Sequence, residues 1–138
     1  MNLIIYTDGG ARGNPGPAGI GVYITDKATG EMVEEHAKFL GSTTNNQAEY
    51  QAAILALQRA VELGAQSVEL VADSELLIKQ ARGEYRVKNA DLAKRYLELK
   101  NLETKLAGRV TYRHVMRTHN KRADALANQA MDEAKTRS

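Results

Sequence analysis

The sequence has 138 residues, a net charge of +2 and no cysteine, and this length is typical of one compact domain. Without cysteine, disulfide frameworks and thiolate metal sites are excluded. The apolar runs are too short to span a bilayer, and charged residues follow Met1 too soon for a signal peptide. We therefore expect a soluble, monomeric, cytoplasmic protein with a single domain over residues 1–138.

The charge is distributed unevenly along the chain. Residues 1–78 carry 4 Lys and Arg against 10 Asp and Glu, whereas residues 79–122 carry 13 against 4. A basic segment of this kind favours a polyanionic partner such as nucleic acid. A solvated, lysine-rich surface explains the charge equally well, and the charge alone leaves both interpretations open.

The first half of the chain predicts three strands and one long helix, over residues 3–8, 19–26, 32–40 and 47–63. The strand segments are rich in β-branched and aromatic residues, and the helix segment repeats its apolar residues at helical spacing. Thr44 is placed to cap that helix and Gly64 to end it. Residues 9–21 hold six of the eleven glycines and both prolines, which predicts a turn-rich loop.

The second half predicts two strands and three helices, over residues 67–73, 74–81, 89–106, 109–115 and from Asn120 onward. The resulting order, β-β-β-α-β-α-α-β-α, predicts an α/β fold with a mixed sheet and helices over its faces. Ligands of such sheets gather outside the carboxyl ends of the parallel strands. Asp8 and Asp73 both stand at predicted strand ends.

Four acidic residues stand out by their positions. Besides Asp8 and Asp73, Glu49 lies in the first turns of the long helix and Asp124 in the first turn of the last one. If the two strands are parallel neighbours, carboxylates meet at one edge and need a cation, for which Mg²⁺ is well suited. Each acid alone could be a turn former or a partner of a helix dipole. Their coincidence at one edge favours a metal site.

Five motifs occur in order along the chain: Thr7–Gly10, Gly13–Pro17, Thr43–Glu49, Ala72–Ser74 and Ala123–Asn128. Together they resemble type 1 ribonuclease H, which cuts the RNA strand of RNA–DNA hybrids, and the similarity covers essentially the whole chain. The resemblance implies a ribonuclease H-like fold, with a mixed five-stranded sheet of three antiparallel strands and two parallel additions. It also implies two Mg²⁺ ions, for which Mn²⁺ can substitute, and products with 5′-phosphate and 3′-hydroxyl ends.

The resemblance also implies roles for individual residues. It assigns catalysis and metal binding to Asp8, Glu49, Asp73 and Asp124. Two cations held there stabilise the attacking and the leaving oxygen of a phosphoryl displacement. The resemblance places substrate contacts on small or polar residues, which read sugars and base edges without demanding a sequence. These residues are Gly9, Asn14, Thr44, Asn45, Asn46 and Ser74. The two neighbouring asparagines are alternatively helix caps.

Two segments depart from the family pattern. Many relatives carry a lysine- and tryptophan-rich protrusion before the helix that begins here near Asn89, whereas this chain has only residues 83–88 and no tryptophan. It therefore resembles the subgroup that lacks the full basic protrusion. Hybrid binding then falls to dispersed cations, namely Lys79, Arg82, Arg86, Lys88, Lys94 and Arg95.

The second departure lies in the loop before Asp124, where the family carries a His or Glu that assists proton transfer or product release. His119 is the candidate for this catalytic role, because imidazole titrates near neutrality. A surface helix cap is an equally good interpretation of His119. The leading hypothesis is a metal-dependent endoribonuclease. The alternatives are a catalytically weak nucleic-acid-binding domain or a related DNA nuclease of the same fold.

Overall fold

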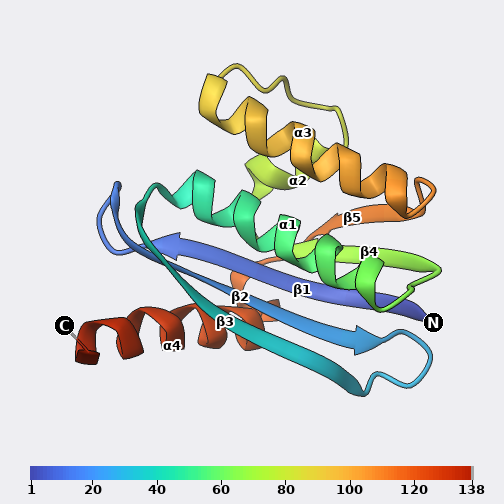
Figure 1. Cartoon of the computed structure of the whole chain (residues 1–138), viewed down its shortest axis with the longest axis horizontal. Helices are drawn as coiled ribbons and strands as arrows, with labels where there is room; N and C mark the ends of the chain where they lie inside the picture. The colour runs from blue at the N-terminus through green and yellow to red at the C-terminus, as the bar shows by residue number, and fades with distance from the viewer. Residues whose placement is uncertain (138) are drawn as a thin grey trace.

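A computed structural model of the protein describes residues 1–137 (Figure 1). These residues form a five-stranded sheet, four α-helices and one short 3₁₀ helix, η1. In chain order the elements are β1 (Asn2–Ala11), β2 (Gly16–Asp26), β3 (Met32–Thr43), α1 (Asn45–Glu62), β4 (Ser67–Ala72), α2 (Glu75–Ala81), α3 (Ala90–Lys105), β5 (Val110–His114), η1 (Arg117–His119) and α4 (Lys121–Arg137).

The sheet has the mixed topology that the sequence predicted. Its strand order is β3-β2-β1-β4-β5. The strands β1, β2 and β3 pair antiparallel, whereas β4 is parallel to both β1 and β5. The central strand β1 therefore joins the antiparallel half to the parallel half. This arrangement confirms the expected fold class.

Helices cover both faces of the sheet. Figure 1 shows α1, α2 and α3 on one face and α4 on the other. The helix α4 packs directly on the backbone of β2, because a Cβ at Gly21 would overlap the Ala123 carbonyl and one at Gly19 would lie 2.7 Å from the Ala127 carbonyl oxygen. Glycine is needed for this close approach, which brings the first turn of α4 next to the sheet.

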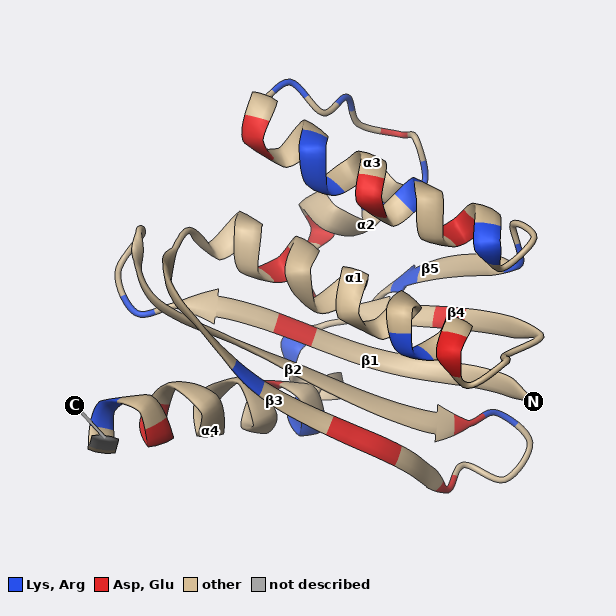
Figure 2. Cartoon of the chain, viewed as in Figure 1, with Lys and Arg blue, Asp and Glu red and all other residues tan. Residues whose placement is uncertain are grey.

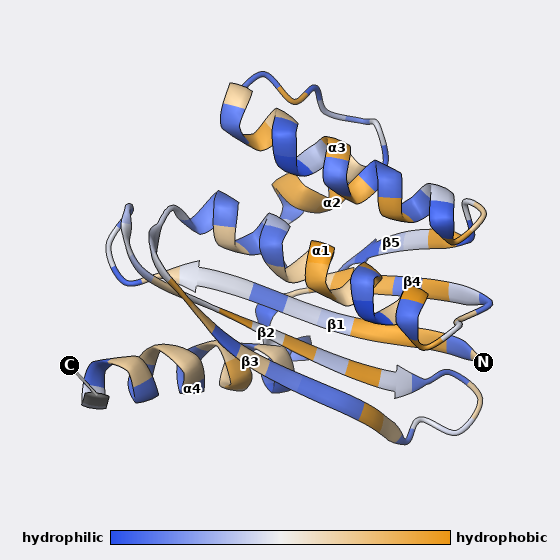
Figure 3. Ribbon diagram, in the orientation of Figure 1, coloured by the Kyte–Doolittle hydropathy of each residue, from blue (hydrophilic) through white to orange (hydrophobic). Residues whose placement is uncertain are grey.

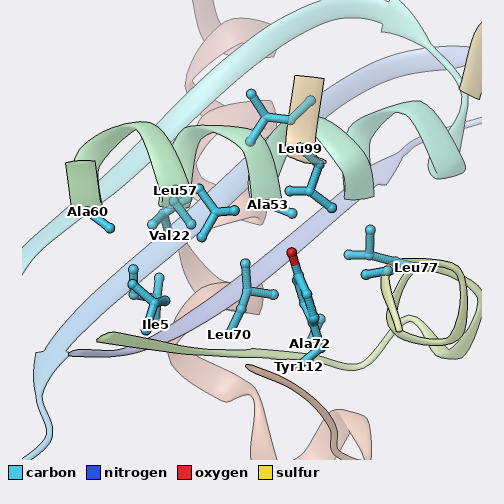
Figure 4. Close-up of a cluster of buried hydrophobic side chains, with 14 of the residues drawn as sticks. Ile5, Val22, Ala53, Leu57, Ala60, Leu70, Ala72, Leu77, Leu99 and Tyr112 are labelled. Carbon is cyan, nitrogen blue, oxygen red and sulfur yellow. The ribbon is translucent and has the colours of Figure 1, made fainter. Parts of the chain in front are cut away.

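The main core lies between the sheet and α1. Ile5 of β1, Val22 of β2 and Leu70 of β4 are fully buried against Leu57 of α1 (Figure 4). Figure 3 shows the matching hydrophobic stretches on β1 and β4. Burying each such side chain contributes roughly 1.5–3 kcal/mol. The helix α3 packs over α1 and contributes the buried Leu99 to the core. The core thus fixes α1 over the centre of the sheet.

The predicted turn-rich loop over residues 9–21 is much shorter in the structure, where only residues 12–15 lie between β1 and β2. Strand β1 continues to Ala11 and β2 begins at Gly16, and Gly9 pairs with Ile20 in the antiparallel ladder. Three of these glycines, Gly9, Gly19 and Gly21, lie in strands where a neighbouring helix approaches too closely for a side chain. Strand β3 likewise extends to Thr43, beyond the predicted end at residue 40. None of the helices within residues 1–137 is long and apolar enough to cross a membrane.

Candidate active site

The parallel pairing of β1 and β4 brings Asp8 and Asp73 together. The last pair of this ladder is Thr7 with Ala72, so both aspartates follow it at the same level of the sheet. Asp8 does not end β1, as the sequence had suggested, but marks the point where β4 leaves it. Glu49 of α1 completes the group. Carboxylate oxygens of these three acids all lie within 4.8 Å of one another.

Asp124 reaches the same place from the other face of the sheet. It lies in the first turn of α4 and lines a cavity of about 400 Å³ together with Asp8, Glu49 and Asp73. Its side chain is 29% exposed and accepts a hydrogen bond of 3.1 Å from Nη2 of Arg117. The four acids predicted from the sequence therefore converge on one cavity, and three of them form its tightest cluster.

Burial and the charges of neighbouring carboxylates make Asp8 and Glu49 hard to ionise. Burial raises the pKa of Asp8 to about 7, and the negative charges of Asp73 and Asp124 add to the effect. Burial is also the largest cause that raises the pKa of Glu49 well above its usual range, and the negative charges of Asp8 and Asp73 raise it further. A cation among these groups would offset both effects.

The chemistry of the cluster fits a hard divalent cation. Its donors are all carboxylate oxygens, which such ions prefer. Among residues 1–137, Oε2 of Glu49 is buried and accepts no hydrogen bond. A buried acceptor without a partner costs free energy, and a bound cation would remove that cost. The residues present therefore fit a metal site.

The predicted cap of α1 is confirmed, and nearby asparagines tie the β1–β2 turn to this helix. The hydroxyl of Thr44 accepts a hydrogen bond of 3.2 Å from the Gln47 amide. The Asn45 amide donates to Oδ1 of Asn14 at 3.1 Å, and Oδ1 of Asn45 accepts from the Ala11 amide at 2.7 Å. These bonds hold the start of α1, and hence Glu49, in register with β1.

The residues predicted to contact substrate surround the acidic cavity unevenly. Gly9 and Asn45 line it. Ser74 follows Asp73 directly and caps α2, accepting a hydrogen bond of 3.2 Å from the Leu77 amide. Asn46 is exposed at the start of α1. The substrate-binding roles of these residues, and of Asn14 and Thr44, stay predictions.

The structure places His119 apart from the four acids. It is exposed at the end of η1 and lines a second cavity of about 410 Å³, whose other residues include Tyr6 and Tyr23. The acidic cavity is lined instead by Arg117, two residues earlier in the same turn. The catalytic role of His119 stays a prediction, without a contact to the acids.

Two residues of the site were missed by sequence reasoning. The hydrogen bond to Asp124 raises the pKa of Arg117, so its guanidinium stays charged beside the cavity. Asn120 is buried, and its Nδ2 lies 2.8 Å from the Thr7 carbonyl oxygen and 3.4 Å from Oδ2 of Asp73. In the sequence, Arg117 is one of many basic residues and Asn120 indicates only a helix start. Their nearness to Asp124 was the one available signal.

Comparisons with known proteins agree with this geometry. A family model described as reverse transcriptase-like matches residues 6–130. Ribonuclease HI of Halobacterium salinarum is 42% identical over 129 residues, which cover 94% of this chain and 64% of that protein. The chain belongs to the type 1 ribonuclease H family. The bifunctional protein Rv2228c of Mycobacterium tuberculosis is 41% identical over 134 residues, which cover 97% of this chain and 36% of that protein.

The ribonuclease H fold is shared with solved structures. LC11-RNase H1, in complex with an RNA/DNA hybrid, matches with a TM-score of 0.91 and 43% identity over 96% of this chain and 98% of that one. These similarities confirm the predicted family. The chain spans 36% of the length of the mycobacterial bifunctional protein and 64% of that of the Halobacterium ribonuclease HI.

Proposed function

We propose that this protein is an endonuclease that hydrolyses the RNA strand of RNA–DNA hybrids and leaves 5′-phosphate and 3′-hydroxyl ends. The observation that carries the proposal is the convergence of Asp8, Glu49, Asp73 and Asp124 on one cavity. Family membership supports it, since the similar LC11-RNase H1 was solved with a hybrid. All four acids come from one chain, which supports a monomeric enzyme.

The four acids would hold two Mg²⁺ ions, with Mn²⁺ as a substitute. Bound ions would lower the pKa of the attacking water and stabilise the leaving 3′ oxygen. Asp8 would be the central ligand of this site, because it lies on the central strand and its carboxylate interacts with Glu49, Asp73 and Asp124. The cluster would supply the negative charge that retains the ions.

Arg117 is placed to act on the phosphate. Its side chain is 78% exposed and lines the cavity above Asp124. A guanidinium stays protonated and has no acceptor, so Arg117 serves as an electrostatic contact to a phosphate oxygen and not as a general base. An exposed side chain can also follow the cleaved phosphate as the product leaves. Arg117 lines the acidic cavity, whereas His119 lines the second cavity, and the catalytic role of His119 stays a prediction.

The enzyme would select the RNA strand through groups that contact a ribose 2′-hydroxyl, which DNA lacks. The partnerless Oε2 of Glu49 supports a role as acceptor for that hydroxyl or for a metal. Asn45, which lines the cavity beside it, contributes polar contacts to the sugar edge.

The basic segment over residues 79–95, from α2 through the α2–α3 loop to the first turns of α3, supports hybrid binding (Figure 2). Three of its six cations are already bonded to protein groups: Lys79 to Glu75, Arg82 to the Tyr112 carbonyl, and Arg95 to Gln47. The other three, Arg86, Lys88 and Lys94, are exposed and form no ion pair within residues 1–137. We assign the phosphate contacts of the hybrid mainly to these three.

A cleavage assay on a panel of substrates tests the proposed function. The protein is incubated with Mg²⁺ and an RNA–DNA hybrid, duplex RNA, duplex DNA or a four-way junction, with and without chelator. We expect metal-dependent cleavage of the RNA strand of the hybrid alone. Cutting of DNA or of the junction would identify the related DNA nuclease. Binding of the hybrid without cleavage would identify a binding domain.

A further inference from the structure

Asn120 occupies an unusual place for an amide side chain. It is 1% exposed, lies directly before α4, and directs Nδ2 at two acceptors, the Thr7 carbonyl oxygen at 2.8 Å and Oδ2 of Asp73 at 3.4 Å. Both neighbours accept hydrogen bonds and neither can donate when Asp73 is ionised, so the nitrogen of the amide must face them. The two N–H groups of Nδ2 match these two acceptors.

The side chain of Asn120 does not serve as a helix cap. A capping oxygen accepts a hydrogen bond from the second or third amide of the helix, but Oδ1 of Asn120 is buried and accepts none within residues 1–137. Its backbone carbonyl starts the helix, since it accepts from the Asp124 amide at 3.1 Å. A buried oxygen without a partner costs free energy. Asn120 therefore keeps its N–H groups on Thr7 and Asp73 at a cost in stability.

We infer that Asn120 is a positioning residue for the carboxylate cluster, an inference that rests on the proposed function. The amide connects the three elements that carry the aspartates: Thr7 precedes Asp8 in β1, Asp73 follows β4, and Asn120 begins the turn that holds Asp124. It fixes the carboxylate of Asp73 relative to β1, as partners of metal ligands commonly do.

The residue type fits this role. A Lys or Arg at the position would orient Asp73 but would also neutralise the cluster and compete with a divalent ion. An Asp would add a further negative charge to groups whose pKa values are already raised. A neutral amide orients Asp73 through hydrogen bonds and leaves the negative charge of the cluster available to a cation.

The test compares Asn120→Ser with a matched control, Gln80→Ala. Serine caps helices well but is too short to reach Asp73. Gln80 is also a buried amide, 4% exposed, which accepts from the Tyr50 hydroxyl at 2.6 Å and donates to the Arg86 carbonyl at 3.2 Å. It lies in α2, away from the acidic cavity. Both variants are examined by thermal unfolding, by Mn²⁺ titration calorimetry without substrate, and by steady-state cleavage of a hybrid.

We expect Asn120→Ser to bind Mn²⁺ about ten-fold more weakly and to lose about ten-fold in kcat, with a KM for the hybrid within about two-fold of wild type. Gln80→Ala should unfold at a lower temperature yet keep the Mn²⁺ affinity and kcat of wild type. If Asn120→Ser retains the wild-type Mn²⁺ affinity and kcat, as the control does, then Asn120 has only a structural role and the inference is wrong.

A second variant tests whether the effect of Asn120→Ser comes only from misfolding. Asn120→Thr introduces a residue type that can cap α4 and fills more of the buried space than serine does, and the same weakening of Mn²⁺ binding is expected of it. Failure of the proposed function has a different signature, because wild-type protein would then leave the hybrid intact. The Mn²⁺ titrations without substrate would still decide the role of Asn120.

Discussion

Gly9 lies so close to Ala48 that a Cβ on Gly9 would overlap the Ala48 carbonyl group and lie 2.7 Å from the Glu49 amide nitrogen. This contact sets the separation between β1 and the first turns of α1. Asp8 precedes Gly9 in β1, and Glu49 follows Ala48 in α1. The same contact therefore also sets the separation of the two carboxylates.

Gly9→Ala should therefore damage both stability and activity. The overlap is with backbone, which cannot move aside, so we expect a loss of about 1–3 kcal/mol in the free energy of unfolding, together with loss of cleavage as Glu49 is displaced. Chemical denaturation measures the first effect. Gly10→Ala is the control, because its nearest neighbour would be Oδ1 of Asn45 at 3.9 Å. Equal stability of the two variants would contradict the packing argument.

Asp8→Asn should abolish cleavage and stabilise the metal-free protein at pH 8. The folded pKa of Asp8 is raised from 3.8 to about 7, so its contribution to stability is fully present below pH 4 and is lost as the pH rises towards 7. We expect the free energy of unfolding of wild type to fall over this window more steeply than that of Asp8→Asn. Denaturant titrations at several pH values check this, and parallel slopes would show that Asp8 ionises freely in the folded protein.

Divalent ions should stabilise the fold by binding the cluster. At a concentration one hundred times the dissociation constant, a ligand that binds only the folded state adds about 2.7 kcal/mol. We expect Mg²⁺ or Mn²⁺ to raise the unfolding temperature and chelator to reverse the rise. In Asp8→Asn the increase should be much smaller. An equal increase in both proteins would place the bound ions elsewhere.

Alanine variants of Arg117 and His119 distinguish the catalytic roles of these two residues. Arg117→Ala removes the cation that lines the acidic cavity, and we expect kcat to fall about ten-fold, about 1.4 kcal/mol of transition-state stabilisation. His119→Ala should slow turnover modestly if the imidazole transfers protons and leave it unchanged if His119 only ends the 3₁₀ turn. The pH profile of kcat decides between these two results, since a proton-transfer role requires one limb to change.

Hybrid affinity should depend on salt through Arg86, Lys88 and Lys94. Replacing all three by Ala should weaken binding and reduce the slope of log affinity against log salt by about two to three, since each phosphate contact contributes about 0.9. The control replaces three cations elsewhere on the surface, Lys27, Lys105 and Arg109. Fluorescence anisotropy at several salt concentrations measures both slopes. A similar loss in the control would point to net charge in place of specific contacts.

The meeting of Asp8 and Asp73 was predictable because they follow paired residues of two parallel strands, and the ladder of β1 and β4 ends just before both of them. The roles of Glu49 and Asp124, which lie on helices, came from the family resemblance. The extent of β1 and β2 was not predictable, because glycine is a poor strand former unless a helix packs on it, and that packing is a tertiary property. The roles of Arg117 and Asn120 depend on which way a side chain turns at the start of α4. No periodicity in the sequence encodes that direction.

The double pairing of β1 has a dynamic consequence. The strand leading into Asp8 is hydrogen-bonded on one side to β2 and on the other to β4, so we expect its amide protons to exchange with deuterium only when the whole domain opens. Arg117, in contrast, lies on the short, exposed η1 turn, where we expect faster exchange through local opening. Under the proposed function, the turn would then move as products leave while the carboxylates on the sheet keep their geometry.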